Sequence, residues 1–191
     1  MKKGFTKIII GQLFLFLNIH FFIDWLPDPI GFFLIHSGIK ELSKRWNLGS
    51  NAIIVKNLAI TFAFLSIPSV FISRTTDQEI FHMFLFTQVY LIIMNIAFLI
   101  FIFYLFHFLF DIAKRAEEQN LLKNSIRLFY LSFIVWLIIG TTQSFVWNIQ
   151  EGWLVMTLSI LYMVNIVLQI LFILLLFSYR KTPDGWLEAK M

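Results

Sequence analysis

The amino-acid sequence predicts an all-α, polytopic membrane protein, built as a single domain of six transmembrane helices with N- and C-termini in the cytoplasm. Hydrophobic residues make up 59% of the 191 positions and charged residues only 14%, whereas a soluble domain carries about 25% charged residues. Apolar stretches of near-membrane length run through almost the whole chain. Because six helices of roughly 20 residues use about 120 residues, a sizeable extramembrane domain is excluded.

The predicted spans follow one another with short connections. They cover about 5–26, 29–45, 52–73, 80–110, 126–147 and 153–178. The first is expected to be a retained anchor, because its apolar stretch is too long for a signal peptide and no small-residue cleavage site follows. Before the second, Asp28 is a good N-cap and Pro29 suits the first helical position.

Two later spans carry further signals. Pro68 predicts a kink in the third span. The fourth span would be about 45 Å long at ~1.5 Å per residue, so it must tilt or extend into the cytoplasm. Residues 111–124 are expected to continue this helix.

The positively charged residues predict the orientation. With six spans and both termini inside, every Lys and Arg except Arg74 and Lys56 lies on the cytoplasmic side, as the positive-inside rule requires. The same rule supports a full crossing by the second span, whose apolar core is short. If that segment dipped and returned, Lys40 and Lys44 would lie opposite Lys2.

Composition excludes several classes of function. The basic residues form no stripe and sit at helix ends, so no nucleic-acid partner is expected. The chain has no Cys, which rules out disulfides, thiol catalysis and thiolate metal sites. The sequence indicates no particular cofactor.

Polar residues inside membrane spans are functional candidates, because placing them in hydrocarbon is costly. The main group is expected toward the outer side and forms a candidate ligand-binding site: His20, Asp24, Asp28, His36, Gln143 and Asn148. One interpretation is a proton- or cation-linked site open to the outside. The other is structural: Asp28 caps a helix, Asp24 holds a tight turn, and His20 bonds to Asp24 four residues later.

Two smaller groups carry alternatives. His82 could complete a metal site with His20 and Asp24, although the chain lacks a ligand spacing such as H-E-x-x-H; an interfacial His is the other interpretation. His107 and Asp111 share a helix face and could act as a catalytic, oriented base. They could equally form an ordinary pair at the water interface.

Amide side chains also occur within the spans. Asn95 in the fourth span, and Asn165 with Gln169 in the sixth, are expected to form hydrogen bonds between helices. Gln143 belongs to an unusually polar outer half of the fifth span. That face is expected to look into the bundle or a wet cavity.

Residues 24–31, Asp-Trp-Leu-Pro-Asp-Pro-Ile-Gly, resemble a D-x-L-P-D-x-I-G motif of small multi-pass membrane proteins from low-GC Gram-positive bacteria. The resemblance covers the first hairpin and departs from the pattern at Pro29, where a large apolar residue is expected. It implies a bacterial cytoplasmic (cell) membrane and brings no activity with it.

Two other families are similar in part. Phe103–His107 and His107–Asp111 resemble the F-x-x-x-H and H-x-x-x-N/D motifs of intramembrane CAAX-type proteases. Leu122 stands where their E-E-x-x-x-R motif needs Arg, so we reject that interpretation. The substrate-binding subunits of energy-coupling-factor transporters are similar in size and in having six helices. Their small-residue docking face has a counterpart in Ala59 and Ala63, but on the third span.

These observations favour a non-enzymatic membrane protein, either a small-molecule binding or transport subunit or an accessory subunit of a complex. The alternatives are an intramembrane hydrolase or protease-like enzyme, and an immunity or structural protein that works through helix–helix contact. The expected partners are the lipid bilayer and either a membrane partner subunit or further copies of the chain.

Overall fold

The computed structural model describes residues 2–20, 27–46, 49–67, 80–148 and 152–182, and within these ranges the protein is all-α. Six helices make up the described part: α1 (Lys2–His20), α2 (Pro27–Trp46), α3 (Ser50–Leu65), α5 (Ile80–Arg115), α6 (Gln119–Asn148) and α7 (Gly152–Lys181). Each overlaps one of the predicted ranges. Pro68 lies outside the described residues, so the predicted kink is not tested.

Three segments are long and apolar enough to cross a membrane: Ile92–Arg115, Gln119–Gln143 and Gly152–Lys181. The shorter α3 is also apolar. Helix α2 has 20 residues and therefore rises about 30 Å, the thickness of a hydrocarbon core. Its first turn contains Pro27 and Pro29, where a backbone N–H has no helical partner to lose. The helix thus begins at Pro27, and Asp28 lies inside its first turn rather than at the predicted N-cap.

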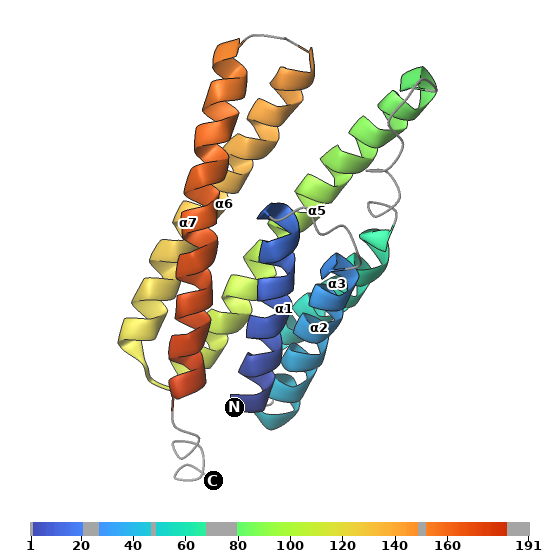
Figure 1. Ribbon diagram of the computed structural model, residues 1–191. Coiled ribbons are helices and arrows are strands. Elements are labelled where there is room, and N and C mark those ends of the chain that lie inside the picture. The colour runs from blue at the N-terminus through green and yellow to red at the C-terminus, as the bar shows by residue number, and fades with distance from the viewer. Residues whose placement is uncertain (1, 21–26, 47–48, 68–79, 149–151, 183–191) are drawn as a thin grey trace.

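The helices form a closed ring. Each contacts the next in chain order, from α1 to α2, α3, α5, α6 and α7, and α7 contacts α1. Figure 1 shows that α1 begins and α7 ends at the same end of the ring. At the opposite end α5 diverges from α6 and α7.

A glycine seam, made of Gly4 and Gly11 on α1 and Gly31 and Gly38 on α2, joins the first two helices. A Cβ on Gly11 would lie 2.5 Å from the carbonyl oxygen of Gly31, and one on Gly38 would lie 2.6 Å from that of Gly4. The two backbones therefore approach as closely as glycine permits, in antiparallel register. Small residues allow this close packing in membranes, where van der Waals contact is the main attraction between helices.

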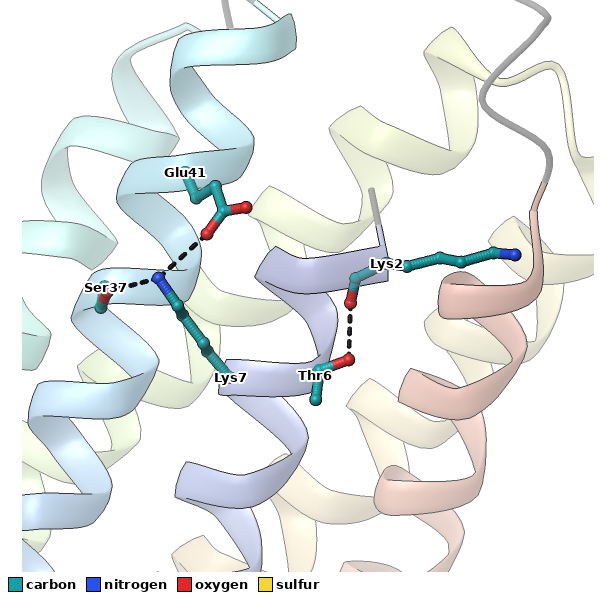
Figure 2. A network of polar contacts seen from close by, with 5 residues as sticks. All are labelled: Lys2, Thr6, Lys7, Ser37 and Glu41. Atoms are coloured by element: carbon teal, nitrogen blue, oxygen red, sulfur yellow. Dashed lines mark hydrogen bonds and ion pairs between the residues drawn. The ribbon is translucent and has the colours of Figure 1, made fainter.

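Polar side chains join the same two helices beside the seam. Lys7 on α1 lies 3.0 Å from a carboxylate oxygen of Glu41 on α2 and donates to Ser37 Oγ at 3.1 Å. Figure 2 shows the Lys7 side chain reaching across to both partners. Because the ion pair is partly exposed, it contributes at most about 1 kcal/mol. It adds to the register that the glycine seam already fixes.

Aromatic rings fill the rest of the interior. Phe32, Phe62 and Phe101 stack or meet edge-to-face between α2, α3 and α5, with ring centroids 5.1–5.7 Å apart. Such pairs add about 0.5–1.5 kcal/mol each beyond the burial of their area. Ala59 and Ala63 are fully buried in this core. They therefore support contacts inside the ring and do not form an exposed docking face.

The connection from α5 to α6 corrects the predicted helical continuation over 111–124. Helix α5 ends at Arg115, and Glu117 has a φ of 56°. The Glu118 N–H donates to the Ala113 carbonyl at 3.1 Å, the reversal typical of helix C-termini. Helix α6 then begins at Gln119. A tight turn thus returns the chain, which the amphipathic charge pattern did not reveal.

Candidate functional site

Inside the ring lies a half-open central cavity of about 190 Å³ to which every described helix contributes. One lining residue from each helix is Gln12 (α1), Asp28 (α2), Phe62 (α3), Asn95 (α5), Trp136 (α6) and Gln169 (α7). The lining comes from the middle of α1 and α7 and from the parts of α2, α3 and α5 remote from the chain termini. The cavity therefore lies in the half of the ring where α5 diverges from α6 and α7 (Figure 1).

Residues from α3 and α5 fix the wall of the central cavity. Tyr90 Oη donates to the Leu65 carbonyl at 2.7 Å, one of the last carbonyls of α3, which lack helical partners. Ser66, the C-cap of α3, also lines the cavity. Asp28 lies in the first turn of α2, where the helix dipole favours a carboxylate.

An inner chamber of about 30 Å³ adjoins the central cavity. The two share the side chains of Gln12, Gln169, Phe98 and Trp136. Gln12 Nε2 donates to Gln169 Oε1 at 2.6 Å, and both residues are buried. The rings of Phe98 and Trp136 lie 4.7 Å apart. One amide pair and one ring pair thus form the common wall.

The inner chamber contains two further polar side chains, Ser132 and Asn165. Asn165 is 2% exposed and Ser132 8%. Neither side chain has a hydrogen-bond partner among the residues that the structure describes. Buried polar groups are nearly always hydrogen-bonded in proteins, so this pair is unusual.

A side pocket of about 200 Å³ lies between α5 and α6 and shares Asn95 with the central cavity. Its polar lining includes Thr141 and Gln143. Asn95 Nδ2 is 3.4 Å from Gln143 Oε1, a long hydrogen bond. Two of the polar residues expected to face the bundle or a cavity, Thr141 and Gln143, therefore do line a pocket.

The structure brings together part of the predicted ligand-binding group. Asp28 lines the central cavity and Gln143 the side pocket. His36 lines none of the three cavities: its Nδ1 donates to the Lys56 carbonyl at 2.9 Å and joins α2 to α3. Asp24 and the side chains of His20 and Asn148 lie outside the described residues.

The two alternative groups fare differently. The described residues contain no cluster of three or more His or carboxylate side chains that could hold a metal, and the side chain of His82 is not described. His107 Nδ1 donates to the Phe103 carbonyl at 2.8 Å, and its ring stacks on Phe103 at 4.0 Å. Asp111 instead accepts a hydrogen bond of 2.9 Å from Asn51 Nδ2. His107 and Asp111 thus each have another partner.

Sequence reasoning missed Gln12, Ser132, Tyr90 and Trp136 as lining residues. Gln12 had a detectable signal, because it is the one amide in the apolar run from residue 8 to residue 17. Ser132 and Trp136 are four residues apart, so they share a face of α6. That face could be recognised only once its partner helices were known.

The cavities have the chemistry of a binding site. Amide side chains each offer two N–H donors and a carbonyl acceptor, and here they line the same cavities as aromatic rings. Small-molecule sites typically combine a mostly apolar lining with a few placed polar groups. No protein-family model, curated protein or solved structure matches the chain.

Proposed function

We propose that the protein is a small-molecule-binding protein of a bacterial cytoplasmic membrane, acting as a binding or transport subunit. The central cavity is the observation that carries this proposal. All six described helices line it, so the ring is organised around it. A chain that served only to present a surface to another protein would have no need of a cavity at its centre that carries a few polar groups.

The ring has different properties at its two ends. Toward the chain termini, Phe108, Leu109 and Ile112 of α5 are all buried, and the interior there is filled. The cavity lies toward the other end. Such a protein accepts its ligand from one side of the membrane and keeps the other side closed.

The distribution of basic residues indicates which end of the ring faces the cytoplasm. The basic residues of α1, α2, α5, α6 and α7 lie within the first or last three turns of their helices, at the end that surrounds the chain termini: Lys2, Lys3, Lys7, Lys40, Lys44, Arg45, Lys114, Arg115, Lys123, Arg127, Arg180 and Lys181. By the positive-inside rule this end is cytoplasmic. In this proposal the helices cross six times, both termini are inside, and the cavity receives its ligand from outside.

The binding function has a direct test in the protein extracted with mild detergent from its own host. Native mass spectrometry of the wild-type protein is expected to detect a copurifying small molecule. Met94→Trp fills the central cavity, which Met94 lines, and should remove that molecule.

The neighbouring residue supplies the control. Ile93 is 55% exposed, so Ile93→Trp places the same indole side chain on the outer surface of the helix bundle. This variant should leave the bound molecule in place. A wild-type protein without any small molecule, or a Met94→Trp variant that retains it, would contradict the proposal.

A further inference from the structure

Asn165 is a buried polar residue that helix packing leaves unexplained. Its 2% exposed side chain faces the inner chamber, and no group in the described part of the chain bonds to it. The hydroxyl group of Ser132 on α6 faces the same chamber and also has no hydrogen-bond partner among the described residues. Burying polar groups without partners is costly. A bound molecule could supply the partner that the described residues do not provide.

The inner chamber is within reach of a molecule in the central cavity. Gln12 and Gln169 face both spaces. Their mutual hydrogen bond uses one N–H of Gln12 and the carbonyl of Gln169. The Gln12 carbonyl and the Gln169 N–H groups stay available, next to Asn165 one helical turn away on α7.

We propose that the ligand is an uncharged ring compound whose polar group both donates and accepts hydrogen bonds at Asn165 and Ser132. This inference rests on the proposed binding function and names its ligand class. The residues that line the inner chamber include no Asp, Glu, Lys, Arg or His. A charged group there would be unpaired in a low-dielectric interior, which is strongly unfavourable.

The central cavity sets the size of the rest of the ligand. A cavity of about 150 Å³ lined by apolar side chains can hold a benzene molecule, and this one measures about 190 Å³. One ring with a small substituent therefore fits. The aromatic pair Phe98 and Trp136 stands where the ring would pass toward the chamber, and offset or edge-on ring contacts are favourable there.

Three probes of similar shape test the charge preference: benzamide, benzoate and benzylammonium. Their dissociation constants are measured by ligand-detected NMR on the full chain in nanodiscs, with empty nanodiscs as the blank. Benzamide is expected to bind at least about tenfold more tightly than either ion. Equal or tighter binding of benzoate or benzylammonium would overturn the inference.

Asn165→Leu tests the position of the polar group. The variant should weaken benzamide binding by about tenfold or more. It should also raise the melting temperature of the ligand-free protein, because Leu needs no hydrogen-bond partner. Val164→Leu, at an exposed neighbouring position, should change neither quantity. If Asn165→Leu does not fold, Asn165→Ala removes the same amide without adding bulk.

The outcomes separate this inference from the proposed function. Unchanged benzamide binding in Asn165→Leu would mean that the inner chamber holds only water, and would overturn the inference. If no probe binds while native mass spectrometry still detects a copurified molecule, the inference fails and the binding function stands. If no probe binds and no copurified molecule is found, both fail.

Discussion

Tyr179 joins three helices through one buried hydroxyl. Its Oη donates to the Leu109 carbonyl of α5 at 3.0 Å and lies 2.8 Å from Ser125 Oγ of α6. Its ring stacks on Phe5 of α1, with centroids 5.6 Å apart. This one side chain of α7 thus holds the filled end of the ring together.

Tyr179→Phe is expected to destabilise the protein modestly. The ring and its stacking remain, and Ser125 keeps its hydrogen bond to the Leu121 carbonyl. The loss is therefore that of ordinary hydrogen bonds, about 0.5–1.5 kcal/mol, and the melting temperature in detergent should fall. Tyr130→Phe, at a position 60% exposed, is the matched control and should unfold like the wild type. Equal melting temperatures for all three proteins would contradict this role.

At single residues the sequence predicted the type of interaction better than its location. The expectation of interhelical hydrogen bonds is confirmed for Gln169, which bonds to Gln12, and for Asn95, which contacts Gln143. It is not confirmed for Asn165, which faces the inner chamber without a partner among the described residues. The two α7 residues share one helix face, and only the helix opposite decides which of them is satisfied.

The glycine seam determines how α1 and α2 pack as a pair. Gly11→Ala should lower the melting temperature clearly, because the new Cβ would lie 2.5 Å from the Gly31 carbonyl oxygen and 2.8 Å from Ile35 Cγ1. These neighbours are backbone and a packed side chain, so the helices must separate to make room.

Gly140 of α6 provides the control, because the same substitution there should not lower the melting temperature. No atom lies within 4 Å of a Cβ at this position, and Ala is a better helix former than Gly by about 0.5–1 kcal/mol. Gly140→Ala should therefore leave the melting temperature unchanged or raise it. A Gly11→Ala protein as stable as Gly140→Ala would show that the seam does not require glycine.

The sequence predicted where the helices occur, because long apolar runs leave few other structures open to the chain. It missed the glycine seam. The seven-residue spacings from Gly4 to Gly11 and from Gly31 to Gly38 are visible in the sequence. Neither spacing alone predicts the contact between α1 and α2, because that contact requires both glycine faces to meet in antiparallel register. The turn at Glu117 was missed because the charges around it also suit a continuous helix.

For the whole molecule, ring closure is the feature beyond the reach of the sequence. Contacts between helices adjacent in the chain follow from short connections, but the contact of α1 with α7 joins the two ends of the chain. The Gln12–Gln169 hydrogen bond is part of that closure, across 157 residues. The central cavity exists because the ring closes. A pass along the chain could therefore identify Asp28 as a candidate residue but not the cavity that it lines.

The proposed six crossings can be tested on a chain that has no Cys, since any introduced thiol is unique. Gly152 is exposed, with open space around its Cβ, and lies at the end of the ring proposed to be outside. A membrane-impermeant maleimide should label Gly152→Cys in intact cells. Lys44→Cys and Lys123→Cys, at the basic end, should react only after the membrane is permeabilised. Labelling of Lys44→Cys in intact cells would show that α2 does not cross, and the central cavity would then need a different orientation in the bilayer.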